Sequence, residues 1–138
     1  MRKIRWRMNL QHEVGFRPLL VLAYVDSAHA AHCGRYFRRL GWEVRLVASA
    51  AEARRLVSIC NPRAVVLDTE LPDESGWLAC AKITQESPEC RVYLLAPERD
   101  HDTTQNLASV NAAGVVCRQD VIELFAETVL GECLAEAV

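Results

Sequence analysis

Two hydrophobic patterns alternate along the chain from residue 18 onward. Short unbroken apolar runs, such as residues 19–25, are typical of strands buried on both faces of a parallel sheet. The segments between them carry apolar or small residues at helical spacing, as at Ala30, Cys33 and Phe37, which indicates amphipathic helices. We therefore predict five strands, each followed by a helix. The strands span residues 19–25, 42–48, 63–67, 91–96 and 114–117, and the helices span residues 27–40, 50–60, 75–86, 102–113 and 120–136.

Turn residues separate these elements with short connections. Asp26 and Ser27 open the first helix, Gly41 ends it, and Pro62 and Pro88 follow the second and third helices. Five strand-then-helix units predict an α/β fold with a doubly wound five-stranded parallel sheet. Right-handed crossovers would place helices on both faces of that sheet. The 138 residues correspond to one domain of ordinary size.

Charge is spread unevenly between the N-terminus and the rest of the chain. Residues 1–17 form an arm with five basic residues and only Glu13 as an acid, whereas residues 18–138 carry a net charge of −6. We interpret the arm as flexible, or as an addition upstream of a start at Met8.

The acidic body is unlike a nucleic-acid-binding domain, and no apolar run approaches the ~20 residues that cross a bilayer. The expected location is the cytoplasm, with no membrane or nucleic-acid contact.

The six cysteines contain no C-x-x-C pair and lie in apolar segments. This pattern favours reduced thiols that are buried or half-buried, because free cysteine behaves as a small hydrophobic residue.

Functional groups in an open parallel sheet gather beyond the carboxyl ends of the strands. The residues at those ends include Asp26, Asp68, Ala96 and Arg118. The turn after the first strand has no glycine, and the chain contains neither a phosphate-binding G-x-x-x-x-G-K-[ST] loop nor a G-x-S-x-G elbow. We expect no enzymatic activity.

The segment VVLDTELPDESG over residues 65–76 resembles the phospho-acceptor segment of bacterial response-regulator receiver domains, h-h-h-D-x-x-[LM]-P-x-x-x-G. The resemblance covers residues 19–136. It implies a CheY-like fold of the flavodoxin type, with strand order 2-1-3-4-5. It also implies that Asp68 is the candidate phospho-acceptor.

The family's metal site, by this resemblance, uses two acids that end the first strand, the acceptor, and the carbonyl two residues after the acceptor. Counting without gaps puts Tyr24 and Val25 where the acid pair belongs, and Asp26 falls one place later. The candidate metal residues are therefore Asp26, Asp68 and Glu70. Because Val25 has no side-chain ligand for Mg²⁺, we expect this site to be weak or absent.

Two further positions of the phosphate pocket depart from the family. Ala96 stands where the family has a Ser or Thr, and Arg118 stands where it has a Lys. Alanine supplies no hydroxyl, and a planar guanidinium does not replace a compact ammonium. We expect an Asp68–Arg118 pair that holds one state permanently.

The resulting hypothesis is an atypical receiver of a two-component system that signals through protein contacts without ordinary phosphorylation. The resemblance implies as partners a sensor histidine kinase or another signalling protein, and an output domain beyond this chain, as in transcription regulation. It also implies a homodimer through the fourth and fifth helices.

Two alternatives remain open. One is a phospho-accepting receiver that uses Asp68 with Asp26 as its single metal acid. The other is a small-molecule or thiol redox sensor that uses Cys117 beside Arg118.

Overall fold

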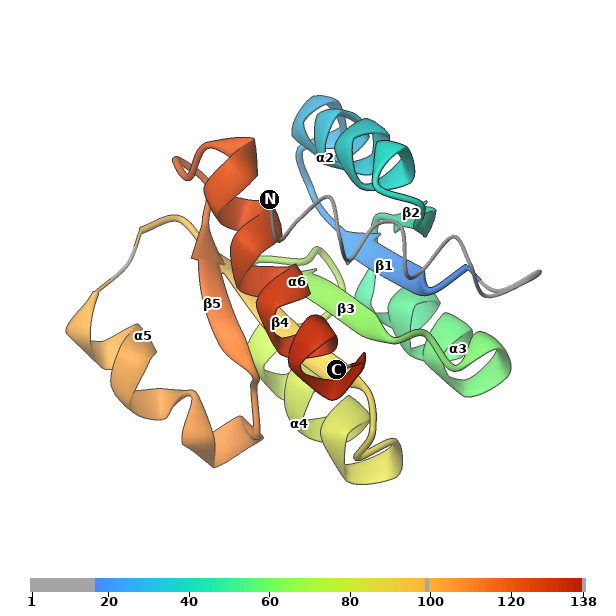
Figure 1. The fold of residues 1–138 in the computed structure, drawn as a ribbon. Helices are drawn as coiled ribbons and strands as arrows, with labels where there is room; N and C mark the ends of the chain where they lie inside the picture. The colour runs from blue at the N-terminus through green and yellow to red at the C-terminus, as the bar shows by residue number, and fades with distance from the viewer. Residues whose placement is uncertain (1–16, 99, 138) are drawn as a thin grey trace.

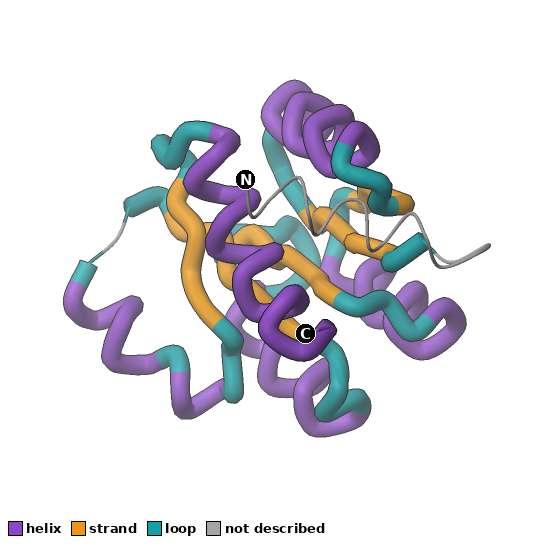
Figure 2. Tube along the Cα trace, in the orientation of Figure 1, coloured by secondary structure: helices purple, strands orange, loops and turns teal. Residues whose placement is uncertain are grey.

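The computed structural model describes residues 17–98 and 100–137, in which strands and helices alternate (Figures 1 and 2). The strands are β1 (Leu19–Ala23), β2 (Glu43–Val47), β3 (Ala64–Asp68), β4 (Arg91–Ala96) and β5 (Gly114–Cys117). The helices are α2 (Ser27–Arg39), α3 (Ala50–Cys60), α4 (Gly76–Glu86), α5 (His101–Asn106), the short 3₁₀ helix η1 (Ala108–Val110) and α6 (Ile122–Ala137).

All strand pairs are parallel, and the sheet has the order β2-β1-β3-β4-β5. Leu20 of β1 lies opposite Val44 of β2 on one side and Ala64 of β3 on the other. The predicted doubly wound parallel sheet and its strand order are confirmed. This order leaves β2 and β5 at the two edges.

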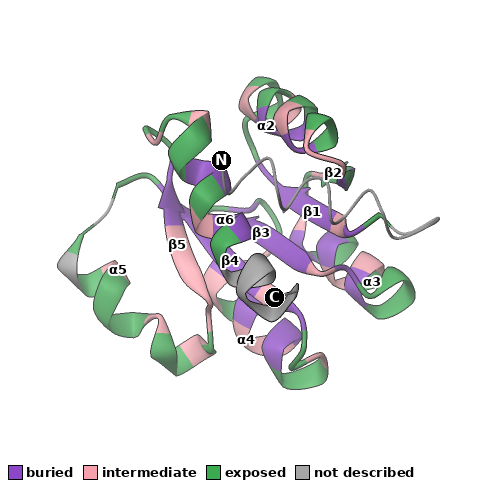
Figure 3. Cartoon of the chain, viewed as in Figure 1, coloured by how far each residue is buried: buried purple, intermediate pink, exposed green. Residues whose placement is uncertain are grey.

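Two apolar cores lie on opposite faces of the sheet. One joins α2 and α6 to the sheet through large side chains that include Phe37, Tyr93 and Phe125. The other packs α3, α4 and η1 against the opposite face around residues such as Val65 and Ile83. Every residue of β3 is buried (Figure 3). The central strand is therefore the most protected place from which to present a polar side chain.

Polar residues begin four of the helices, as the sequence predicts for the first of them at Asp26. Asp26, Ser49, Ser75 and Asp100 each accept a hydrogen bond from a backbone N–H in the first turn of their helix. Such N-caps satisfy N–H groups that have no partner within the helix.

Most element boundaries lie within two residues of the prediction, and two departures have a clear physical reason. The first strand ends at Ala23 rather than residue 25, because the Val25 N–H turns toward the Asp68 carboxylate. The predicted helix over 102–113 is divided into α5 and η1. Asn111 adopts a left-handed backbone conformation (φ 57°), and the Ala113 N–H already pairs with the Val92 carbonyl of β4. The chain therefore leaves the helix before residue 111.

Four of the five cysteines whose side chains are described, Cys33, Cys80, Cys90 and Cys117, are buried, as expected, whereas Cys60 is exposed. In the described part of the chain, no helix has the length and apolar character to cross a membrane. Nearly all of the predicted basic arm, residues 1–16, lies outside the described residues.

Candidate functional site

Asp68 is the last residue of β3, at the carboxyl end of the sheet, and only 1% of it is exposed. The chain folds back tightly after it, with the Gly76 N–H bonded to the Thr69 carbonyl at 3.2 Å. A Cβ atom at Gly76 would lie 2.3 Å from the Asp68 carbonyl oxygen. The glycine of the sequence motif is therefore needed so that α4 can begin directly against the strand that carries the carboxylate.

Three groups hold the Asp68 carboxylate. Arg118 donates from Nη2 to Oδ1 at 2.7 Å, and the Glu70 N–H donates to the same oxygen at 3.0 Å. The Val25 N–H donates to Oδ2 at 3.4 Å. Because a buried charge is costly without partners, this set of donors explains how an ionised carboxylate is accommodated here.

Arg118 follows β5, and its backbone N–H is fixed by the Ala96 carbonyl at 3.1 Å. Its guanidinium bridges two acids, since Nη2 also lies 3.2 Å from Glu70 Oε1. The hydrogen bond to Asp68 raises the pKa of Arg118 above its ordinary value. The structure thus brings three predicted site residues, Asp68, Glu70 and Arg118, into one cluster.

Ala96 lies beside this cluster at the end of β4. It is 2% exposed and opposite Cys117 in the strand register. Its methyl group offers no hydrogen bond, so its backbone carbonyl, which receives the Arg118 N–H, is the polar group that it contributes here.

The end of β1 contributes little side-chain chemistry to the site. Tyr24 is buried, with its hydroxyl 3.7 Å from Cys33 Sγ and its ring against Phe125, and burial raises the pKa of its phenol. Val25 is 56% exposed. Asp26 is used as a helix cap, accepting from the His29 N–H at 3.1 Å. Within the described residues, no group of three or more His, Cys, Asp or Glu side chains is arranged to hold a metal ion.

Sequence reasoning missed the role of Asp73, in the loop between β3 and α4. Its carboxylate accepts the N–H groups of Ala50 and Ala51 at 2.9 and 3.0 Å, which lowers its pKa. The loop after Asp68 is thereby tied to the first turn of α3. No local signal predicts this contact, because the partners are 22 and 23 residues apart in sequence.

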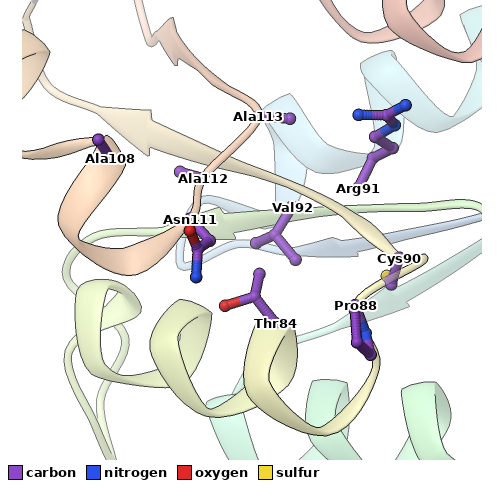
Figure 4. Close-up of a pocket in the computed structure, with 9 residues that line it drawn as sticks. All are labelled: Thr84, Pro88, Cys90, Arg91, Val92, Ala108, Asn111, Ala112 and Ala113. Carbon is purple, nitrogen blue, oxygen red and sulfur yellow. The ribbon is translucent and has the colours of Figure 1, made fainter.

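A separate pocket of about 420 Å³ lies near the amino end of β4, whereas Asp68 lies at the carboxyl end of β3 (Figure 4). Its lining includes Thr84, Cys90 and Asn111, and Arg91 is the charged residue among the lining residues. The Thr84 hydroxyl already donates to backbone carbonyls, among them that of Val110. We assign no chemistry to this pocket.

The fold, the buried acid that ends β3 and the cation after β5 define a class of signalling domain. The sequence model of the response regulator receiver domain matches residues 25–127, and the chain belongs to this family. Receiver domains are modules of two-component signal transduction. No curated protein sequence matches the chain.

Solved structures share the fold at low sequence identity. The signal receiver domain of a putative LuxO repressor protein from Vibrio parahaemolyticus is 19% identical, with a TM-score of 0.77 over 88% of this chain and 97% of that chain. A CheY-like receiver from Methanospirillum hungatei JF-1 is 16% identical, with a TM-score of 0.80 over 88% and 96%. A LuxR-family response regulator from Aurantimonas sp. SI85-9A1 is 23% identical, with a TM-score of 0.77 over 88% and 87%.

Proposed function

We propose that this chain is an atypical receiver that signals through protein contacts and does not depend on phosphorylation of Asp68. The observation that carries the proposal is the 2.7 Å ion pair between Arg118 and a carboxylate that is 1% exposed. The Arg118 guanidinium, which stays protonated, balances the negative charge of the unmodified Asp68 carboxylate. The ion pair then holds the domain in one conformation without a phosphoryl group.

The donors around Asp68 do not fit a magnesium ion, which takes oxygen ligands in an octahedral arrangement. The end of β1 offers an N–H donor from Val25, while the Tyr24 hydroxyl is directed at Cys33 and Asp26 caps α2. Oδ1 of Asp68 is already occupied by two donors. A metal ion here would have to displace these contacts and would gain few oxygen ligands.

A phosphoryl group on Asp68 would also lack stabilising donors. Transfer of a phosphoryl group depends on fixed positive charge and hydrogen-bond donors at its oxygens. Ala96 supplies no hydroxyl, and the guanidinium of Arg118 is shared between Asp68 and Glu70. These features favour the unphosphorylated form as the signalling form.

The proposed partners are other signalling proteins, including a histidine kinase, and an output domain of the kind that regulates transcription, in the cytoplasm. A homodimer through α5 and α6 belongs to the same proposal. Its support is two large apolar residues exposed at the start of α6, Val121 (63%) and Leu124 (43%), since exposed apolar patches are common at protein interfaces.

The test is intact-mass measurement after incubation with a small-molecule phosphodonor and Mg²⁺, with a phosphorylation-competent receiver as positive control. We expect no phosphoryl adduct on the wild-type chain. A variant that restores the family residues, Val25→Asp with Ala96→Thr and Arg118→Lys, is expected to gain an adduct that Asp68→Asn then removes.

An adduct on the wild-type chain that Asp68→Asn abolishes would contradict the proposal. The chain would then be a phospho-accepting receiver, and Asp26→Asn would test the single metal acid. Calorimetric titration gives a second measurement. We expect no saturable Mg²⁺ binding to the wild-type chain at millimolar concentrations.

A further inference from the structure

The two halves of the chain carry opposite charge. Residues 1–63 contain twelve basic and four acidic residues, a net charge of +8, whereas residues 64–138 contain four basic and fourteen acidic residues, a net charge of −10. The overall charge of −2 hides this polarity. Strong charge asymmetry between halves of a sequence is a signal of interaction with a charged partner.

The strands of the two halves occupy different parts of the sheet. Strands β1 and β2 with helices α2 and α3 come from the basic half and form one side of the sheet (Figure 1). Strands β3, β4 and β5 with α4, α5 and α6 come from the acidic half and form the other side. Among the described residues, 17–63 carry a net charge of +5 and 64–98 with 100–137 carry −11, so the charge changes sign between the β2 and β5 ends of the sheet.

Three arginines lie in the second half of α2, the helix that packs beside β2, and we call them the arginine edge: Arg35, Arg38 and Arg39. All three are exposed. Arg38 Nη2 donates to the Val44 carbonyl at 3.0 Å, which fixes the end of α2 against β2. Leu46 of β2 is 41% exposed. It lies beside α2, since a Cβ at Gly34 would be 3.5 Å from the Leu46 side chain.

The outer surface of α6 carries the opposite charge, and we call Glu123 and Glu127 with Leu124 the glutamate face. Both glutamates are exposed, and they lie four residues apart, so that they project from neighbouring turns on one side of the helix. Leu124 is 43% exposed. Each surface thus combines exposed charges of one sign with one exposed leucine.

We propose that the arginine edge of one copy of this chain docks on the glutamate face of a second copy. Opposite charges steer such an encounter and set its orientation, and Leu46 and Leu124 supply apolar surface to bury. Because α2 and α6 pack side by side on one face of the sheet, the arginine edge of each copy can meet the glutamate face of the other across a two-fold axis, which closes a dimer. This contact covers Leu124 and therefore competes with the α5–α6 homodimer, and it does not depend on the phosphorylation state of Asp68.

A second copy fits this edge better than a nucleic acid does. Residues 18–138 carry a net charge of −6, which repels a polyanion as a whole. A second copy presents a localised acidic surface and brings its own basic edge, so that opposite charges are paired across the contact.

The test measures the weight-average mass of the full chain by sedimentation or light scattering over a range of protein and salt concentrations. At low salt we expect the mass to rise with protein concentration above the 15.5 kDa of one chain. Near 1 M salt, where charges are screened beyond about 3 Å, we expect the mass to fall at the same protein concentration. A wild-type chain that stays monomeric at low salt, or that associates equally at low and high salt, overturns the proposal.

Charge-reversed variants test the two surfaces. Two variants, Arg35→Glu with Arg39→Glu and Glu123→Lys with Glu127→Lys, are each expected to associate less than the wild type at low salt. An equimolar mixture of the two variants is expected to associate again, because each variant then finds its opposite charge on the other. Circular dichroism melting checks that both variants fold.

A matched control separates docking from bulk charge. Glu86→Lys with Glu89→Lys makes the same charge change at exposed residues near the end of α4, and we expect it to associate as the wild type does. Loss of association in this control, or a variant mixture that associates no more than either variant alone, contradicts the assigned surfaces.

Discussion

Gly76 is the residue whose size matters most for the position of Asp68. A methyl group there would lie 2.3 Å from the Asp68 carbonyl oxygen and 2.9 Å from Thr69 Cα, and neither backbone atom can move without shifting the site. We predict that Gly76→Ala lowers the free energy of unfolding by about 1–3 kcal/mol, the usual range for overpacking, measured by urea denaturation.

Gly131 in α6 provides the matched control for this prediction. Nothing lies within 4 Å of a Cβ built at Gly131, so alanine there adds helix propensity without a clash. We expect Gly131→Ala to raise the stability by about 0.5–1 kcal/mol. If both alanine variants were equally stable, the close approach at Gly76 would not constrain the fold.

Arg118 is predicted to stabilise the folded protein through Asp68. Arg118→Met removes the cation and leaves the buried carboxylate with backbone N–H donors from Glu70 and Val25. We expect a loss of about 1–3 kcal/mol in the free energy of unfolding, below the range for fully buried pairs because Arg118 is partly exposed. Adding Asp68→Asn to this variant should recover part of the loss. No recovery would mean that Arg118 acts through its aliphatic stem alone.

The apolar runs in the sequence predicted which residues lie at the carboxyl ends of the strands, and therefore which side chains meet at the site. Asp68, Ala96 and Arg118 each end or follow an apolar run, and the parallel fold brings such positions to one edge of the sheet. The sequence did not predict that the Val25 N–H would bond to the carboxylate, nor that Tyr24 would turn its hydroxyl to Cys33. Those contacts depend on the exact backbone path after β1, which periodicity does not encode.

At the scale of elements, apolar runs and helix caps predicted all five strand-helix units, because buried parallel strands and capped helices have local signals. The division of the fourth helix was missed. Its residues 102–113 have helical composition, but tertiary pairing of Ala113 with Val92 and the left-handed Asn111 override local propensity. The contact from Asp73 to α3 was missed for a related reason, since it joins two elements.

The Asp73 contact predicts a pH dependence of stability. Hydrogen bonds from Ala50 and Ala51 lower the pKa of Asp73 in the folded protein, so the unfolded chain binds a proton more readily. The stabilisation is therefore complete above the ordinary aspartate pKa of about 3.9 and is lost as pH falls through the lowered folded value. We predict that Asp73→Asn lowers the melting temperature at pH 7 and that its difference from wild type shrinks in acid.

A matched acid residue identifies the source of that effect. Asp102 lies in the first turn of α5 and is exposed, and its carboxylate makes none of the described hydrogen bonds. Asp102→Asn is expected to change the melting temperature less than Asp73→Asn at pH 7. An Asp73→Asn difference that stayed constant from neutral to strongly acidic pH would contradict an ionic contact.

For the whole molecule, burial predicts which thiols react. Burial raises the pKa of Cys80 to about 12 and also raises the pKa of Cys33, and the thiolate is the reactive form. In a Cys133→Ser background we predict that one thiol, Cys60, reacts rapidly with a chromogenic disulfide. The buried Cys33, Cys80, Cys90 and Cys117 should react only on unfolding.

The same measurement of thiol reactivity also tests the redox-sensor alternative. Adding Cys60→Ser to the Cys133→Ser background should remove the rapid phase of the reaction with the chromogenic disulfide. Rapid reaction of Cys117, which is 3% exposed beside Arg118, would instead favour the thiol redox sensor over the proposed phosphorylation-independent receiver.

The bond from Arg38 to the Val44 carbonyl has a consequence for how the protein behaves when crowded. Adjoining backbone groups of β2 pair with β1, so the Val44 carbonyl faces the open side of the sheet, where an extended segment of another molecule could bond. Edge strands exposed in this way are templates for irreversible aggregation. The guanidinium occupies that carbonyl and places a positive charge in the path of an incoming strand. Neighbouring chains therefore meet this edge through side chains, and their contact can be undone by salt.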